Sequence, residues 1–385
     1  FQTPMWDYNI QLLTISRSAA AHEYGALFAD AGTGNLIRGV DVSEHRTAGE
    51  KASWLLMAEI KTAEQAKQLE NPDSIVAFHD LSGKLIQIYL KSHTGLQTGD
   101  NDQFSFLFWE LDKIEEPWTL FQRTAENTVH YSGARQVLRW YPNGDRIKDN
   151  PSSAIRGIDC VKKKGVLVHR MASLPCTFFL GEIFDQNGAA FILKSENNLP
   201  AVWCYVSSSQ YNDDVRKVDS KLGVTPATLE KVPFDLEHWS KVAAEKYPHG
   251  LPKPYTDDPT QWIFHGHPCG SVLWDDGTKR TAHGPLRTGD TVLQIAVARL
   301  LGYRWPAELD GEMELADVQR EWVNRCEALL PCADGDGIVC IPPVRGELPA
   351  SDRLLDLLAA AYGDAWSGDV LAELLKNADH AGKTL

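Results

Sequence analysis

Basic and aromatic residues are concentrated between positions 131 and 170, where nine Lys/Arg residues stand against three Asp/Glu residues. The basic residues are Arg135, Arg139, Arg146, Lys148, Arg156, Lys162, Lys163, Lys164 and Arg170, interleaved with Tyr131, Trp140 and Tyr141. Arg can read guanine edges in the major groove with two parallel hydrogen bonds, while Lys acts mainly as a counter-charge to phosphate. Such a run can also be only a solvated charged face, so both interpretations stay open at this point.

A second group that could do chemistry is the histidine pair His265 and His267, which has Asp257 and Asp258 before it and Cys269, Asp275 and Asp276 after it. Zinc enzymes gather His, Cys and carboxylate ligands around one ion, so this group could serve a metal-dependent hydrolase. The pair, however, spans a glycine in a proline-rich loop, and this arrangement lacks the fixed helical spacing of known zinc motifs. Structural histidines are therefore favoured, and we expect no bound metal.

Two motifs of methyl transfer are incomplete or missing. Residues 30–35 superficially resemble the glycine loop with which class I methyltransferases hold S-adenosylmethionine, but that loop needs a helix after it. Residues 36–41 have the composition of a strand, so we interpret 30–35 as a hairpin turn. The Asn/Asp-Pro-Pro-aromatic tetrapeptide that receives a flipped base is missing, because Pro342-Pro343 is flanked by Ile341 and Val344. We expect no catalytic and no cofactor-binding residue in this chain.

Length and charge limit the remaining possibilities. A chain of 385 residues is long enough for two or three hydrophobic cores. The net charge of −14 has the wrong sign for a surface that binds nucleic acid everywhere, so any DNA contact must be local. Residues 301–385 hold seven Lys/Arg against sixteen Asp/Glu, which separates an acidic flank from the basic middle.

The cysteines and the hydropathy bear on the cellular location. The seven cysteines are odd in number and include no Cys-x-x-Cys pair, so we expect reduced thiols. No apolar run approaches the roughly 20 residues of a membrane-spanning helix, and no signal peptide is evident. We expect a cytoplasmic protein with no membrane partner.

The periodicity predicts a mixed α/β (α+β) chain. Thr47-Ala48-Gly49-Glu50 fits a capping box, which predicts that a helix begins there. Between about 104 and 205, short aromatic and β-branched runs alternate with turn residues, which is typical of a mixed or mainly β module. From 236 onwards the pattern is mostly helical, most clearly in residues 293–301, 316–330, 350–362 and 367–377.

The segment 95–101, Gly-Leu-Gln-Thr-Gly-Asp-Asn, followed by Phe104, resembles a Gly-Leu-x-Thr-Gly-x-Asn segment of large adenine-specific DNA methyltransferases. These enzymes belong to BREX and DISARM phage-defence systems and to single-chain, type IIG-like restriction-modification systems. The resemblance continues, in the same order along the chain, through residues 224–229, 231–235, 258–268, 291–294 and 301–306. The order of these segments carries the resemblance, since no single one is decisive.

The resemblance implies three regions. Residues 1–94 would be the C-terminal edge of a methyltransferase core or a connector, 95–235 the target-recognition domain, and 236–385 a helical C-terminal domain. The parent enzyme would bind S-adenosylmethionine and carry the catalytic motif in an N-terminal half that this chain lacks. The chain begins without Met and stops within a helical pattern, so we expect a part of a longer protein that is inactive alone.

The resemblance also favours DNA contact by the basic run, because a recognition domain must supply phosphate and base contacts. The expected DNA-binding residues are Gln97, Asn101, Arg135, Arg139, Lys148, Arg156, Lys162, Lys163, Lys164 and Arg170. For Gln97 and Asn101, integrity of the loop around Gly95 and Gly99 is an equally good explanation. The expected partners are double-stranded DNA, the missing methyltransferase half and other phage-defence subunits. Two alternatives remain: an acidic interaction module after residue 235, and the metal-dependent hydrolase.

Overall fold

The computed structural model describes residues 36–40, 42, 45, 47–71, 74–78, 81, 83–219 and 221–383. The hairpin turn predicted at residues 30–35 lies outside these residues. The strand predicted after it is confirmed, because β1 (Leu36–Gly39) pairs antiparallel with β2 (Lys61–Glu64). Between them lies α1 (Ala48–Met57), and the short 3-10 helix η2 (Ala66–Leu69) follows.

The helix start predicted at Thr47 is confirmed. The Thr47 hydroxyl oxygen accepts from the Glu50 backbone N–H at 3.2 Å, and the Glu50 carboxylate accepts from the Thr47 N–H at 3.1 Å. These reciprocal bonds satisfy amides that would otherwise have no partner in the first turn. Sequence therefore fixes the beginning of α1 locally, although no α1 side chain is buried.

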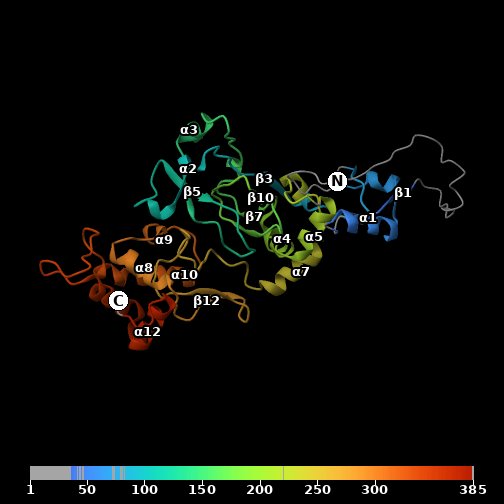
Figure 1. Cartoon of the computed structure of the whole chain (residues 1–385). Coiled ribbons are helices and arrows are strands. Elements are labelled where there is room, and N and C mark those ends of the chain that lie inside the picture. The colour runs from blue at the N-terminus through green and yellow to red at the C-terminus, as the bar shows by residue number, and fades with distance from the viewer. Residues whose placement is uncertain are drawn as a thin grey trace, which may run out of the picture.

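The middle of the chain is built on a four-stranded antiparallel sheet in the order β3-β10-β7-β8 (Figure 1). Its strands are β3 (Leu90–Thr94), β7 (Gly165–His169), β8 (Cys176–Phe179) and β10 (Gly188–Leu193). The helices α4 (Leu199–Val206), α5 (Ser209–Val218) and α7 (Leu236–Lys246) share one buried core with it, which includes Phe191, Trp203 and Tyr211. These helices cover one face of the sheet, while Leu167, Phe179 and Ala190 on the other face are buried together with Cys160 and Phe184.

The sheet begins before the predicted boundary at residue 95. β3 precedes that boundary, yet all five of its residues are in register with β10. The preceding turn, η4 (Ile86–Ile88), is joined to residues near 232, since the Ile86 N–H donates to the Val232 carbonyl at 3.0 Å. Residues 84–94 therefore share the fold of the module that follows them.

A second four-stranded sheet has the order β4-β6-β5-β9, with β5 and β9 parallel and the other pairs antiparallel. Its strands are β4 (Ser105–Leu107), β5 (Trp118–Gln122), β6 (Gln136–Arg139) and β9 (Ile183–Phe184). The short elements around it are α2 (Asn101–Phe104), η5 (Phe108–Glu110), η6 (Pro142–Gly144), α3 (Asp145–Lys148) and η7 (Ile158–Cys160). The short strands predicted between about 104 and 205 as a mixed or mainly β module are present, and η8 (Glu196–Asn198) and α6 (Pro226–Leu229) follow them.

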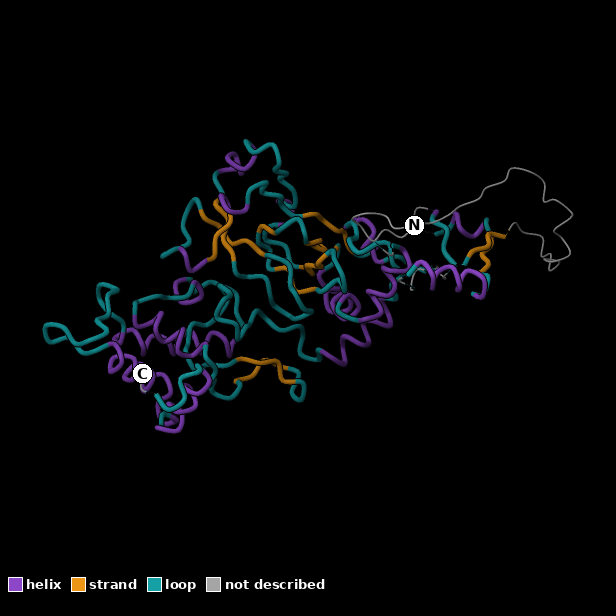
Figure 2. Tube along the Cα trace, viewed as in Figure 1, coloured by secondary structure: helices purple, strands orange, loops and turns teal. Residues whose placement is uncertain are grey.

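The C-terminal part is mostly helical, as predicted (Figure 2). Its helices are α8 (Thr291–Leu300), α9 (Pro306–Leu309), α10 (Asp317–Arg325), η9 (Cys326–Cys332), α11 (Ala350–Tyr362), η10 (Gly363–Ala365) and α12 (Gly368–Asn377). One hairpin interrupts the helical pattern, formed by β11 (Val272–Asp275) and β12 (Arg280–His283). A shared core of Phe108, Val137, Phe264 and Trp305 packs this part against the second sheet.

The mixed α+β class predicted from the sequence is confirmed. All seven cysteines are free, as expected for reduced thiols. Among the described residues, every helix is too short or too polar to cross a membrane.

Candidate nucleic-acid interface

The glycines of the segment 95–101 have physical reasons in the fold. A Cβ on Gly95 would lie 2.4 Å from the carbonyl oxygens of both Phe184 and Asp185. Gly99 has a φ of +75°, in the left-handed region that favours glycine. Between them, the buried Leu96 donates its N–H to the Phe184 carbonyl at 2.7 Å. The segment is a closely packed junction that connects β3 to the second sheet.

Gln97 and Asn101 use their side chains inside this junction. The Gln97 side-chain amide donates to the Ser152 carbonyl at 2.8 Å, and the Gln97 backbone pairs with Ala154. The Asn101 side-chain oxygen accepts from the Thr98 hydroxyl at 2.7 Å. These contacts favour the loop-integrity interpretation of both residues, and their contact with DNA stays a prediction.

Three of the predicted DNA-binding cations also have partners within the chain. The Arg170 guanidinium donates to the carbonyls of Val224 and Gln186, both at 3.0 Å, and so fastens the end of β7. Lys148 forms an ion pair with Asp145 at 3.1 Å, and Lys164 forms one with Glu314 at 3.0 Å. The bonds of Arg170 favour a structural role, and its contact with DNA stays a prediction. The two exposed lysine pairs are of the weakly bound kind that a phosphate can displace.

The other cations of the basic run, including Arg146, are exposed. Arg139 lies over the rings of Trp118 and Tyr141 at 5.8 and 5.4 Å, and Arg146 lies over Tyr141 at 4.9 Å. We call Arg139, Arg146, Trp118 and Tyr141 the arginine–aromatic surface. Four further cations are exposed and have no ion-pair partner among the described residues, namely Arg135, Arg156, Lys162 and Lys163.

A groove of about 760 Å³ lies between the β5–β6 connection and residues 255–272. Arg123 and Arg135 line it on the side of the connection, and Asp257 and Asp258 line it on the other side. Arg123 is paired with Asp185 at 3.4 Å, while Arg135 has no ion-pair partner within the part of the chain that the structure describes. Opposite charges therefore face each other across the groove, whereas Arg139 and Arg146 of the arginine–aromatic surface have no ion-pair partner among the described residues.

His130 at the groove holds three parts of the chain together. Its Nδ1 lies 2.8 Å from the Tyr255 hydroxyl and its Nε2 lies 2.9 Å from the Tyr247 hydroxyl. The Tyr247 hydroxyl also accepts from the Trp203 indole N–H at 2.9 Å. Burial lowers the pKa of His130 to about 4, against the opposing effect of Asp276. The imidazole is therefore neutral at pH 7, with one nitrogen donating and the other accepting.

Acid is expected to destabilise the fold through His130. Because its folded-state pKa lies below the unfolded value near 6.5, the unfolded chain gains the proton first as the pH falls. The contribution of neutral His130 to the free energy of unfolding is complete above about pH 6.5. About 3 kcal/mol of that contribution is lost by about pH 4. Urea unfolding at both pH values measures the free energy of unfolding. The decrease in this free energy from the higher to the lower pH should be about 3 kcal/mol smaller in His130→Gln than in the wild type. His249→Gln, at an exposed histidine, should leave that dependence unchanged, and equal curves for both variants would contradict this role of His130.

The candidate ligands His265, His267 and Asp258 do not converge. The His265 Nδ1 accepts from the His267 backbone N–H at 3.0 Å. The Asp258 carboxylate accepts from the Thr260 N–H and hydroxyl at 2.8 and 2.7 Å, which makes it a turn-forming residue. The carboxylate facing His265 is Asp257, with its Oδ1 3.8 Å from Nε2. The geometry favours the structural interpretation of this histidine pair.

The loop that carries these histidines is fixed by a buried ion pair. Arg299 donates from Nε to the Gly266 carbonyl at 2.7 Å, and its Nη2 lies 2.6 Å from the Glu308 Oε2. The side chains of Arg299 and Glu308 are 2% and 3% exposed. The Glu308 Oε1 also accepts from the Trp305 N–H at 2.9 Å. One charge pair thus joins the loop to α8 and α9.

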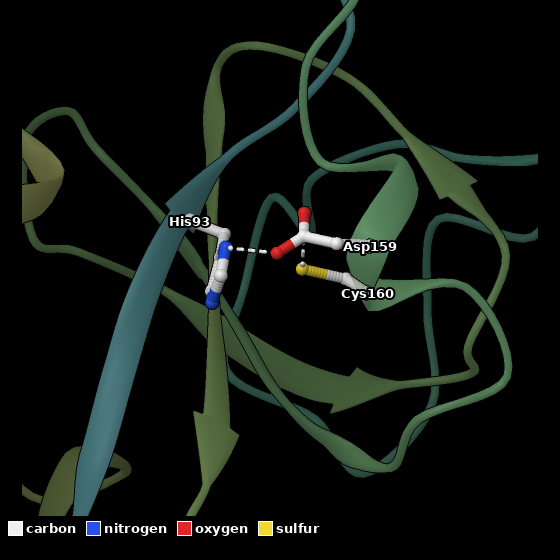
Figure 3. A group of neighbouring side chains, drawn as sticks. All are labelled: His93, Asp159 and Cys160. Atoms are coloured by element: carbon white, nitrogen blue, oxygen red, sulfur yellow. Dashed lines mark hydrogen bonds and ion pairs between the residues drawn. The ribbon is translucent and has the colours of Figure 1, made fainter.

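One cluster of possible ligands, formed by His93, Asp159 and Cys160, was not predicted from the sequence (Figure 3). His93 lies on β3 and points toward η7, which carries the other two residues. Burial lowers the pKa of His93 and raises that of Cys160 to about 12. No spacing rule identifies this cluster, because 66 positions separate His93 from Asp159 and Asp159-Cys160 matches no known motif.

Comparison with models of known protein families finds no match, and no curated protein is similar enough to the chain to count as a relative. The resemblance of residues 95–101 and the segments after them therefore stands on the motifs alone.

Proposed function

We propose that this chain is the DNA-recognition part of an S-adenosylmethionine-dependent, adenine-specific DNA methyltransferase that acts in a cytoplasmic phage-defence or restriction-modification system. The arginine–aromatic surface is the observation that carries the proposal. The residues predicted as the connector, 1–94, would adjoin the methyltransferase core up to about residue 83, since 84–94 pair with the module that follows. The N-terminal half of the parent enzyme would supply the cofactor site and the catalytic motif. This chain's part is to bind the duplex and select its sequence.

The arrangement of Arg139 and Arg146 suits a polyanion. A guanidinium that lies over an aromatic ring is held in place by cation–π attraction. Its N–H groups stay free at the edge to donate to phosphate or to a guanine edge. Neither arginine has an ion-pair partner among the described residues, although the whole chain carries a charge of −14. A cationic surface that carboxylates do not neutralise is where a local DNA contact is expected.

Salt dependence of duplex binding tests this proposal. In fluorescence anisotropy with a mixed-sequence duplex, affinity should fall steeply between about 50 and 200 mM salt. The double variant Arg139→Ala/Arg146→Ala should reduce the slope of log K against log salt by about 2, because two phosphate contacts are lost. Lys241→Ala is the control, since Lys241 pairs with Glu237 on α7, outside the basic run. No duplex binding at low salt, or an unchanged slope in the double variant, would refute the proposal.

An interaction module at the C-terminus is the second candidate function. The segment between η9 and α11 exposes apolar side chains, with Ile338 67%, Ile341 83% and Leu348 55% exposed. The two ends of this segment are held together by the Arg353–Asp334 ion pair at 2.6 Å and by the Ala350 N–H, which donates to the Cys340 carbonyl at 2.9 Å. The surrounding charge is acidic, so a basic defence subunit is the expected partner. Capture of such a subunit by the wild type, and not by Ile338→Ser/Ile341→Ser, would favour this function.

A further inference from the structure

We propose that His93, Asp159 and Cys160 form a zinc-binding site at the edge of the central sheet. The His93 Nδ1 lies 3.3 Å from the Asp159 Oδ2, and the Cys160 Sγ lies 3.9 Å from the Asp159 Oδ1. All three donor atoms lie within 4.8 Å of one another, and Figure 3 shows them facing a common point. This inference does not depend on the proposed role in DNA recognition.

The separations are close to those that a tetrahedral zinc ion imposes. Zinc bonds of about 2.0–2.1 Å to nitrogen or oxygen and about 2.3 Å to sulfur place neighbouring donors about 3.3–3.7 Å apart. The 3.3 Å between the His93 Nδ1 and the Asp159 Oδ2 already falls in this range, whereas the 3.9 Å from the Cys160 Sγ is measured to the other carboxylate oxygen, Oδ1. With one oxygen of Asp159 as the ligand, all donor pairs lie within 4.8 Å, so the pairs that include the sulfur need to close by at most about 1.2 Å. Rotation of the exposed Asp159 carboxylate and of the Cys160 thiol can supply such a change.

The donor set suits zinc in both chemistry and access. One sulfur, one imidazole nitrogen and one carboxylate oxygen match the borderline softness of zinc better than the all-oxygen sites of magnesium or calcium. Cys160 is fully buried and the His93 side chain is 14% exposed, while the Asp159 side chain is 64% exposed. An ion therefore enters from the solvent past Asp159, and water completes the fourth position. On binding, the Cys160 thiol releases its proton to the solvent as the sulfur–zinc bond forms.

The charged residues around the cluster determine how tightly zinc is expected to bind. Lys91 and Lys163 lie near enough to act electrostatically on both His93 and Cys160, and both oppose a divalent cation. Glu230 has the opposite effect on His93. Three ligands with two cations nearby should bind more weakly than a closed four-ligand structural site. We therefore expect an exchangeable ion rather than a permanent one.

Cobalt(II) is the probe for this site, because a thiolate–cobalt bond gives a charge-transfer band that a hydrogen-bonded thiol cannot give. Titration of the full chain should show this band at one equivalent, and zinc should remove it. Cys160→Ser should abolish the band, and His93→Gln should weaken cobalt binding at least about tenfold. Cys340→Ser is the control for adventitious thiol binding, and it should leave the band intact.

Two results would overturn the zinc site. One is a wild-type titration without the charge-transfer band; the other is a band of equal strength in Cys160→Ser. If Cys160→Ser loses its fold by circular dichroism, Asp159→Asn replaces it, because Asp159 is largely exposed and the amide preserves its shape. That variant should weaken cobalt binding without a change in unfolding temperature, and unchanged binding would refute the site.

Discussion

Replacing Glu308 by alanine is expected to lower the free energy of unfolding by about 3–5 kcal/mol. The substitution leaves the Arg299 guanidinium buried with no counter-charge, in a place where its side chain is 2% exposed. It also removes the acceptor of the Trp305 N–H at the start of α9. Urea unfolding followed by circular dichroism measures the loss.

The matched control is a charge pair on the surface. Lys241 and Glu237 lie 2.8 Å apart on α7, but their side chains are 71% and 82% exposed. Glu237→Ala should therefore cost less than about 1 kcal/mol. Removing both buried charges, as in Arg299→Met/Glu308→Leu, should recover much of the loss, because no unpaired charge remains. Equal losses in Glu308→Ala and Glu237→Ala would show that water reaches the buried pair.

The variant Gly95→Ala is expected to destabilise the fold by about 3 kcal/mol. Its new methyl group would lie 2.4 Å from two backbone carbonyl oxygens, those of Phe184 and Asp185. Backbone atoms cannot rotate away as a side chain can, so the junction between β3 and β9 must separate. Thermal and urea unfolding measure the effect, and DNA binding should decrease in parallel because the junction adjoins the basic run.

Gly49→Ala is the control for this substitution. Gly49 lies in the first turn of α1, and a Cβ there has no atom within 4 Å among the described residues. Alanine favours the helix over glycine, so the variant should be unchanged or more stable by up to about 1 kcal/mol. A Gly95→Ala protein as stable as Gly49→Ala would mean that close backbone approach does not explain the first glycine of the motif.

Local signals in the sequence predicted much of the fold. The capping box at Thr47 acts over three residues, and the helices after 236 repeat their apolar residues at helical spacing. The β11–β12 hairpin was not predicted, although Asp276-Gly277 is a hairpin signal that lies between its strands. The early start of the sheet could not be inferred, because β3 pairs with β10, about 100 residues later.

The candidate site was less predictable, because contacts with residues far away in the sequence decide which of its side chains are paired and which stay exposed. The basic run has uniform composition, yet Arg170 bonds the carbonyl of Val224 and Lys164 pairs with Glu314. No local pattern separates these residues from Arg139, whose guanidinium stays exposed. The ligand cluster of His93 with Asp159 and Cys160 exists only after β3 and η7 come together.

The joined ends of the β module have an evolutionary consequence. The Phe234 N–H donates to the Lys84 carbonyl at 2.8 Å, beside the bond from Ile86 to Val232, so the two ends of residues 84–234 lie side by side. A segment with adjacent ends can be exchanged as a cassette when its contacts with the rest of the chain are kept, which here are the packing of α7 and the core shared with the C-terminal part. On the proposed function, recombination between residues 84 and 234 would transfer a new sequence preference while the flanking parts of the protein are kept.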